Sequence, residues 1–460
     1  MEALFNEVSS CIEEYPLLKQ FGIYGAIATA FALYGISLVI YRLYFHPLAG
    51  FPGPSIAAAT GWYEFYYDVV KSGQYIYKIE EMHKKYGPII RINPYEIVIN
   101  DPDFYNDVYV AGNTRQTNIW PRYRTGMGYD GSHTMTEGHE LHRRRRKPLE
   151  PFFSRLGIDK MEPMIIDESK LLNDRLTGLK GSGNVVRLDH VFTAFAGDMI
   201  GRICSESPPD MMNNPEFAKD CQEKVQRNSR SSIFRYIINS DMPESERETE
   251  RLSKEAMILF GGGTTTTART LSIMCYYIIA NPHMRARLGE ELKGPMANYP
   301  HQLPTWQELE RLPYLQGMVK EGLRLSYGAM RRLPRISPDV PLVYKQWSIP
   351  AGVPVGMAAY SLHTDPETYP EPLKFIPERW LGNYDPKMNR NWVPFTRGSR
   401  NCLGINLAYA EMYWALAVMF RPNAPRFELF QTDESDIALS VDFSMPLPKL
   451  DSRGLRITIH

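Results

Sequence analysis

The sequence predicts a mainly α-helical fold with a minor β portion, formed by one large domain after an N-terminal membrane-spanning helix. Two long stretches, residues 248–279 and 306–325, repeat apolar residues at helical spacing. Strand-like patterns are shorter and cover residues 91–100 and 342–357. Residues 21–41 carry no charge. Together these observations favour a helical domain held at a membrane by an N-terminal anchor.

The uncharged run FGIYGAIATAFALYGISLVIY covers residues 21–41. A helix of this length spans about 30 Å, which matches the hydrocarbon core of a bilayer. Acidic residues precede the run and Arg42 follows it, which argues against a cleaved signal peptide and favours a cytosolic body. A buried soluble helix is the alternative. We expect residues 1–20 to form a short N-terminal segment, residues 42–55 a stiff Pro/Gly hinge, and residues 56–460 the domain.

The remaining elements of the domain follow in order along the chain. Pro94 places the first strand-like stretch at a sheet edge or a bulge. Asn281, followed by a proline, ends the first long helix. The short strands after residue 342 turn at Gly352, and residues 365–400 are rich in Pro, Gly and Asn, which predicts an irregular but ordered segment. Residues 406–420 are apolar at helical spacing.

Composition limits the class of protein. The chain has 52 Lys and Arg against 52 Asp and Glu, so its formal net charge is zero, which argues against a protein built to bind nucleic acid. Its five Cys are far apart and form no CxxC pair. We therefore expect no disulfide framework and no zinc ribbon, and a reducing compartment fits better.

The strongest local signal is the segment PFTRGSRNCLG over residues 394–404. Gly398 and Gly404 flank Cys402, and a helix is expected to follow directly. Glycines let the backbone approach a flat ligand and direct amides at the sulfur, while a helix N-terminus stabilises a thiolate. A lone Cys is more often an inert small hydrophobic residue, so the local pattern alone leaves both interpretations open.

The segment spells FxxGxRxCxG through Phe395, Gly398, Arg400, Cys402 and Gly404. This pattern resembles the haem-binding loop of the cytochrome P450 (haem-thiolate monooxygenase) family. Three further motifs occur in the family's order: EGLR at residues 321–324, PERW at 377–380 and FGGGTTTTA at 260–268. The resemblance covers the chain after the anchor. It is strongest to fungal secondary-metabolism members, including trichodiene oxygenase-like enzymes.

The resemblance implies haem b (iron protoporphyrin IX) as the cofactor, with Cys402 as the axial ligand of the iron. Phe395 would pack beside the ligand loop, Arg400 would pair with a haem propionate, and Gly404 would bind the cofactor with its backbone.

Glu321 and Arg324 share one helix face, and by resemblance they form a buried network with Arg379 that supports the Cys loop. Taken alone, Glu321 and Arg324 would more often be a solvated surface pair.

Taken alone, the glycine and threonine run reads as a loop, because each glycine costs a helix about 1 kcal/mol relative to Ala. By resemblance it belongs to a long central helix whose Gly262 and Gly263 pass the distal face of the haem. Thr266 would then help to deliver protons to bound dioxygen. Thr265 stands where the family usually has an acid. Proton supply would therefore run through hydroxyl groups, including Thr265, and through ordered water, or would be slower.

The densest basic run, RRRRK, covers residues 143–147. A nucleic-acid patch and a solvated helix face are both open interpretations. By resemblance, His142 and Arg146 occupy the positions of Trp and Arg in the family's WxxxR motif, and the Arg reaches a haem propionate. His142 in place of Trp is a departure. The outward-pointing arginines are expected to meet the acidic face of a reductase.

Only 120 residues separate Arg146 from Thr266, which is short for the family. The deficit falls between Phe217 and Phe234, where the family usually has two long helices that roof the substrate pocket. The chain is therefore either a compact member or a shortened, mis-spliced version with an open distal pocket. An open pocket would admit water.

The leading hypothesis is a membrane-anchored monooxygenase that takes electrons from an NADPH-dependent reductase and uses dioxygen to hydroxylate or epoxidise an apolar small molecule. A terpenoid or another fungal secondary metabolite is the expected substrate. By resemblance, the protein is single-pass in the endoplasmic reticulum membrane, with its catalytic domain in the cytosol. The alternatives are a non-oxygenase haem-thiolate isomerase or dehydratase, suggested by Thr265, and a catalytically impaired relative, suggested by the short segment.

Overall fold

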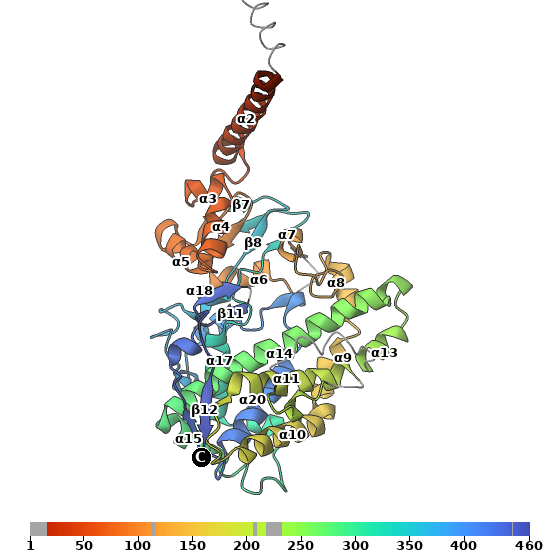
Figure 1. Cartoon of the computed structure of the whole chain (residues 1–460), viewed down its shortest axis with the longest axis vertical. Helices are drawn as coiled ribbons and strands as arrows, with labels where there is room; N and C mark the ends of the chain where they lie inside the picture. The colour runs from red at the N-terminus through yellow and green to blue at the C-terminus, as the bar shows by residue number, and fades with distance from the viewer. Residues whose placement is uncertain (1–15, 112–115, 206–208, 218–231, 444) are drawn as a thin grey trace, which may run out of the picture.

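The computed structural model of the chain describes residues 16–111, 116–205, 209–217, 232–443 and 445–460. Figure 1 shows a helix-rich body from which α2 (Pro16–Ile40) projects at one end, with the C-terminus at the other. The predicted mainly helical domain with a minor β portion is confirmed.

The anchor is a helix exposed along its length. The apolar stretch Ile23–Phe45 is long enough to cross a bilayer, and none of its most apolar window is buried against the body. It begins and ends close to the predicted residues 21–41. This geometry is consistent with a membrane anchor.

The connector after the anchor is packed onto the body. Tyr41–Phe45 continues α2 as one π-helical turn. The Arg42 guanidinium in this turn donates a hydrogen bond to the Tyr95 hydroxyl at 2.6 Å. Leu48 is fully buried. The predicted hinge over residues 42–55 is therefore irregular only after its first turn, and these contacts fix it to the domain.

Long helices form the core of the body. They are α10 (Arg155–Gly178), α11 (Leu188–Cys204), α14 (Thr249–Ala280), α15 (Pro282–Leu292), α17 (Pro313–Ser326) and α20 (Ile405–Phe420). Every residue of α20 from Ala410 to Phe420 is buried, as expected for a helix that, Glu411 apart, is apolar on all sides.

Shorter helices connect these elements. They are α3 (Ser55–Ala59), α4 (Trp62–Phe65), α5 (Tyr75–Tyr86), α6 (Tyr105–Val108), α7 (Pro121–Arg124), α8 (His139–Arg146), α9 (Glu150–Phe153), α13 (Ser232–Ile238), α16 (Trp306–Glu310), α18 (Ala359–His363) and α19 (Pro386–Asn391). The Pro-rich segment 365–400 contains α19 and two 3₁₀ turns and is otherwise irregular, as predicted.

The β portion consists of small sheets. One has the strand order β1 (Ile89–Arg91), β2 (Ile97–Ile99), β8 (Pro354–Gly356), β5 (Arg335–Ile336), β3 (Asn118–Ile119). A second has the order β4 (Val186–Arg187), β12 (Arg456–Ile459), β9 (Phe427–Leu429). Two hairpins pair β6 (Leu342–Tyr344) with β7 (Trp347–Ile349) and β10 (Val441–Phe443) with β11 (Met445–Leu447).

Two of the predicted elements are divided in the structure. The helix expected over residues 306–325 is broken, because Pro313 starts a new helix and Leu312 before it is extended. The strand expected over residues 91–100 is a hairpin of β1 and β2, with Pro94 in the turn. Of the two strands, β1 is the edge strand of the sheet, as predicted for this stretch, whereas β2 also pairs with β8 and is an interior strand.

Candidate active site

The loop before α20 is closed on itself and docked against a distant segment. The Cys402 amide donates to the Phe395 carbonyl at 2.9 Å. Gly398 has a φ of 80°, and a Cβ there would collide with the carbonyls of Tyr109 and Val110. Only glycine therefore allows this close approach. The loop that carries Cys402 is thus held by its own backbone and by residues 109–110.

The Cys402 side chain is surrounded by protein atoms yet keeps accessible surface. Burial raises the pKa of its thiol, while the Gly404 amide and Arg146 lower it. The residue is nevertheless among the exposed ones. A side chain that lines an internal hollow combines these two properties. A Cβ on Gly404 would meet no atom within 4 Å, so the backbone beside the sulfur also faces open space.

Arg146 of α8 holds the residue next to Cys402. Its two terminal nitrogens donate to the carbonyl oxygen of Asn401 at 2.6 Å and to its side-chain Oδ1 at 2.9 Å. Its Nε donates to Glu150 at 3.0 Å. The Arg146 guanidinium is thus engaged in positioning the Cys loop.

Beneath the loop, the structure brings Glu321, Arg324 and Arg379 into one network. The carboxylate of Glu321 accepts from Arg324, from Arg379 Nε at 2.9 Å and from Trp380 Nε1 at 2.8 Å. Arg324 also donates to the His363 carbonyl at 2.8 Å. Glu321 and Arg324 are fully buried. The surface-pair interpretation is therefore wrong, and the network ties α17 to the Pro-rich segment.

One face of α14 is open at the glycine-rich stretch. Gly261, Gly262 and Thr265 are exposed, and Thr266 is half-buried. A Cβ on either Gly261 or Gly262 would meet no atom within 4 Å. The Thr266 hydroxyl donates to the Gly262 carbonyl at 2.6 Å. This side of the helix can therefore accept a flat ligand at van der Waals distance.

Gly263 has a different role from the predicted one. A Cβ at this position would lie 3.0 Å from the Ile200 side chain on α11. Gly263 therefore allows α11 and α14 to pack closely and does not belong to the open face. The same packing explains why the glycine and threonine run is helical and not a loop, since burial of the opposite face outweighs the low helix propensity.

A cluster of basic side chains lies near the Cys loop. Burial lowers the pKa of Arg400 to about 9, and Arg335 and Arg146 contribute. Burial lowers the pKa of His142 to about 2. The nearby charges of Arg400, His133, Arg146 and Arg335 lower it further. Neither Arg335 nor Arg400 forms an ion pair with a carboxylate among the residues that the structure describes; both donate to main-chain carbonyls. The cluster is therefore suited to an anion.

Sequence analysis assigned no role to Arg335. It is almost fully buried on β5. Arg335 follows Arg324 by 11 residues, and this spacing is the one feature of the sequence that could have marked it as a site residue. Its long-range neighbours, Arg400 and His142, cannot be inferred from sequence separation.

Comparison with protein families matches residues 60–235 and 216–449 to the family described as Cytochrome P450. The chain belongs to the cytochrome P450 family. It is therefore a cytochrome P450 monooxygenase, which uses dioxygen and an organic substrate. The family expected from the sequence and the haem-thiolate cofactor that it implies are confirmed.

Three curated relatives illustrate the similarity of this P450. It is 66% identical to the cytochrome P450 monooxygenase tndB of Aspergillus flavipes, over 88% of this chain and 100% of that protein. It is 54% identical to stellatic acid synthase of Emericella variicolor, over 95% of each chain. It is 42% identical to a fusicoccadiene C-8 hydroxylase of Phomopsis amygdali, over 92% of this chain and 93% of that protein.

The alignments contain many positions where this P450 has no residue. The alignment with tndB runs over 484 positions but uses 88% of 460 residues, which leaves about 80 positions as gaps in this chain. With stellatic acid synthase, 499 positions against 95% of the chain leave about 60. The two family matches overlap over residues 216–235. The expected short segment between Phe217 and Phe234 lies there, and its residues 218–231 are outside the described part of the structure.

The residues of the site fit a haem. A sulfur ligand lines a hollow, α14 presents an open face, and the basic cluster can neutralise carboxylates. Two buried nitrogens, His142 Nδ1 and Arg400 Nε, have no hydrogen-bond partner among the described residues. Buried polar atoms are rarely left unpaired. Propionate oxygens would supply the missing acceptors.

Proposed function

We propose that this P450 oxidises an apolar terpenoid in a fungal secondary-metabolite pathway, by hydroxylation or epoxidation. Its similarity to stellatic acid synthase and to a fusicoccadiene hydroxylase supports this substrate class. The loop geometry around Cys402 is the observation that carries the assignment of the centre. Turnover of candidate terpenes by the purified protein, with NADPH, a reductase and dioxygen, tests the proposal. Product formation that depends on all three is expected, and none with any terpene would contradict the substrate class.

In this proposal the thiolate of Cys402 would hold the haem iron. The bound haem supplies the oxygen chemistry, which the thiolate promotes by donating electron density. The amide of Gly404 directs a partial positive charge at the sulfur, and Phe395 packs edge-on against Tyr409 at 5.5 Å, which holds one side of the loop. Arg146 acts through Asn401 to keep the loop in place.

On the opposite side of the site, Gly262 lets the α14 backbone approach the cofactor, and Thr265 and Thr266 provide hydroxyl groups. In the structure, the Thr266 proton is directed to the Gly262 carbonyl. Rotation of this hydroxyl would release the proton toward the open face, where water can replenish it. Thr265 stands where the family usually has an acidic side chain. Proton delivery in this P450 therefore depends on hydroxyl groups and water.

The basic cluster would bind the two propionates. Arg400 and Arg335 contribute charge, and neutral His142 contributes its ring nitrogen in place of the family's Trp. Hydrogen bonds to charged groups are about twice as strong as neutral ones. Removal of any one of these three side chains is expected to speed haem loss.

An NADPH-dependent reductase is the proposed electron donor. Arg143, Arg144 and Lys147 are exposed on and beside α8, the helix whose Arg146 contacts the Cys loop. A basic surface near the cofactor favours an acidic partner and predicts that association weakens as salt rises. Measuring reduction rates against ionic strength tests this interaction.

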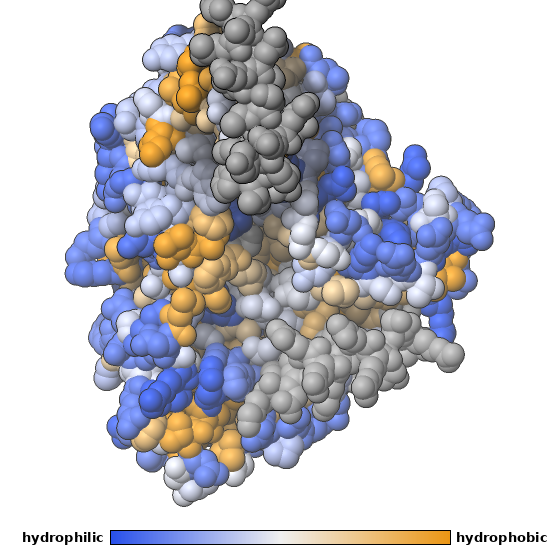
Figure 2. Space-filling model, turned by 45° about the horizontal axis from the view of Figure 1, so that its top comes forward, coloured by the Kyte–Doolittle hydropathy of each residue, from blue (hydrophilic) through white to orange (hydrophobic). Residues whose placement is uncertain are grey.

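The proposed location is the endoplasmic reticulum membrane, with α2 crossing the bilayer once and the domain in the cytosol. Large apolar side chains are exposed near the anchored end of the body, among them Tyr44, Phe45, Trp62 and Val70. Figure 2, which brings this end forward, shows hydrophobic side chains among the polar ones there. Aromatic residues at a membrane interface favour this orientation. Fractionation of tagged protein with membrane markers tests the location.

The short segment leaves two alternatives to test. The chain is either a compact member of the family or a shortened, mis-spliced version with an open distal pocket, and the overlapping family matches at residues 216–235 are compatible with both. Sequencing of the transcript around this segment distinguishes a native short form from a splicing error. A non-oxygenase isomerase or dehydratase, suggested by Thr265, would convert its substrate without NADPH and reductase. A catalytically impaired relative would bind haem and yield no product.

A further inference from the structure

A buried ionic network lies under residues 132–137, which we call the strap. The strap directly precedes α8 in the chain and contacts the Cys loop. Its residues Ser132, His133 and Thr136 are buried. Below it, α14 contributes Glu255, which has no exposed surface. None of the roles proposed above uses this network.

One end of the strap is held by Glu255. Its carboxylate accepts the main-chain amide of His133 at 3.1 Å, the Nδ1–H of the same ring, and Arg251 Nη2 at 2.7 Å. Burial alone would raise the pKa of Glu255, but His133 and Arg251 lower it below its ordinary value. Glu255 is thus a buried carboxylate held by three donors, and its negative charge strengthens each of these hydrogen bonds.

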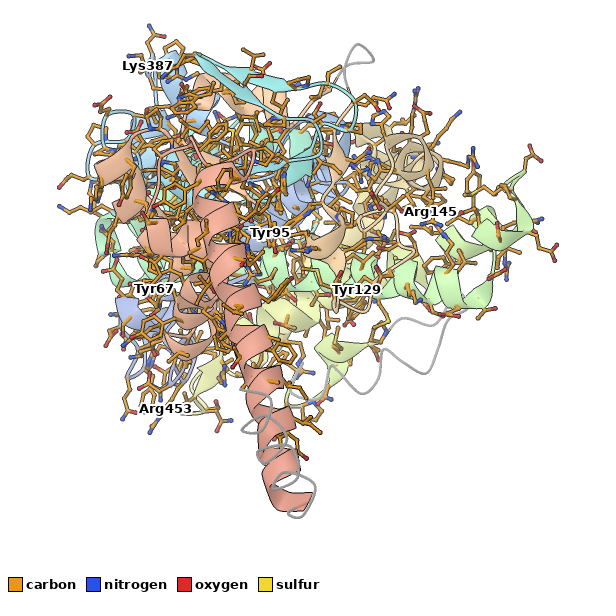
Figure 3. The ribbon with its side chains drawn as sticks, turned by 90° about the horizontal axis from the view of Figure 1, so that it is seen from above. Tyr67, Tyr95, Tyr129, Arg145, Lys387 and Arg453 are labelled. Carbon is orange, nitrogen blue, oxygen red and sulfur yellow. The ribbon has the colours of Figure 1, made fainter. Side chains whose placement is uncertain are left out.

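The other end of the strap is held by the Cys loop. Arg400 donates one terminal nitrogen to the Thr136 carbonyl and the other to the Glu137 carbonyl, each at 2.7 Å. Arg145, labelled in Figure 3, donates to the Thr136 hydroxyl at 2.9 Å. Since both terminal nitrogens of Arg400 bind the strap, the strap position sets where its unpartnered Nε points.

The strap also reaches the second group that we assign to the cofactor. The rings of His133 and His142 lie 6.3 Å apart, centroid to centroid. His133 therefore packs close to His142, whose Nδ1 has no partner among the described residues. A shift of the strap would release both His142 and Arg400.

We propose that Glu255 is a positioning residue for the haem: by fixing His133 it sets the strap, and the strap aims Arg400 and His142 at the propionates. This inference rests on the proposed haem site. Glu255 binds the strap and not Arg400 itself, and the strap is hydrogen-bonded to Arg400 but only in ring contact with His142, so most of its effect is expected to pass through Arg400. Coupling between the two residues is therefore the property to measure.

The test is a double-mutant cycle on the full-length holoenzyme, with Glu255→Gln and Arg400→Gln. The rate of haem transfer to excess apomyoglobin is measured for all four proteins. Glu255→Gln in the parent should raise this rate about tenfold, as expected for loss of a coupling of the usual size. In the Arg400→Gln background, the same change should alter the rate less than about twofold.

Glu250→Gln is the matched control. Glu250 lies on the same helix and pairs with Lys254 four residues on, as Glu255 pairs with Arg251, but its side chain is 82% exposed. It should leave haem transfer unchanged. If Glu255→Gln does not yield holoenzyme, Glu255→Asp, which keeps the charge but shortens the side chain, enters the same cycle.

Equal rate increases in both backgrounds, or no increase in the parent, would overturn the inference and leave Glu255 with a structural role alone. A second readout is the propionate bending band in resonance Raman spectra, which should shift in Glu255→Gln and not in Glu250→Gln. The absorption of the reduced, carbon monoxide-bound parent is recorded first. A parent without a thiolate-bound haem would contradict the proposed function itself.

Discussion

The carboxylate of Glu321 accepts two hydrogen bonds from Arg324, at 2.9 and 2.8 Å, and neither side chain has any exposed surface. The two residues are three apart on α17, so the pair needs no distant segment to form. Its other partners come from the end of α18, where the His363 carbonyl accepts from Arg324, and from the Pro-rich segment, which supplies the Pro372 carbonyl and Arg379. The Glu321–Arg324 pair therefore joins α17 to the Pro-rich segment that supports the Cys loop.

Arg324→Ala should abolish recovery of folded, haem-loaded protein. It leaves the Glu321 charge buried without its main partner, which costs about 3–5 kcal/mol. Haem content and thermal unfolding of the purified variant measure the effect. Lys374→Ala, which breaks the exposed pair with Glu371 at the same spacing, should change stability by less than ~0.5 kcal/mol. A stable, fully loaded Arg324→Ala protein would contradict this role.

Gly398→Ala should displace the Cys loop and lower haem content. The new Cβ would collide with the carbonyls of residues 109 and 110, and its φ of 80° adds strain. Gly382→Ala is the control: its φ is 64°, but a Cβ there would meet no atom within 4 Å. If both variants lose haem equally, strain and not the close approach is responsible.

Thr266→Ala should divert reducing equivalents from product to hydrogen peroxide, because a hydroxyl on the open face of α14 is lost. The ratio of product to NADPH consumed measures the coupling. Ser253→Ala on the same helix is the control, since Ser253 also donates to the carbonyl four residues back but lies far from the glycine-rich stretch. Unchanged coupling in Thr266→Ala would remove this residue from proton delivery.

Glu168 on α10 should make stability depend on pH. Burial raises its pKa to about 7, although Arg202 lowers it. The folded protein then holds a proton that the unfolded chain loses above its ordinary pKa of 4.5, so stability falls as pH rises through this window. The loss is up to ~3 kcal/mol. Denaturation at pH 5 and pH 8 should show it in the parent and not in Glu168→Gln.

Elements whose boundaries are set by neighbouring residues could be predicted from the sequence. The long helix α14 ends one residue from its predicted end, because Asn281 stops it and caps α15 through its side chain. The glycine-rich run within α14 could not be read locally, because its helical state depends on packing against α11. The break at Pro313 was missed because the apolar spacing continues across it.

Long-range relationships set the limit for the site. Glu321 and Arg324 lie three residues apart, so they could be paired from the sequence. Glu255 and His133 are 122 residues apart, and their contact has no local signal. Arg335 was missed for the same reason, and Gly263 was misassigned because spacing alone does not show which face of a helix is open.

The absorption spectrum of the reduced, carbon monoxide-bound protein tests the central claim most directly. The parent should show the long-wavelength Soret band of a thiolate-ligated haem, and Cys402→Ala should lack it while Cys204→Ala, at a buried free cysteine, keeps it. A parent without bound haem, or a Cys402→Ala protein that retains the band, would contradict the account.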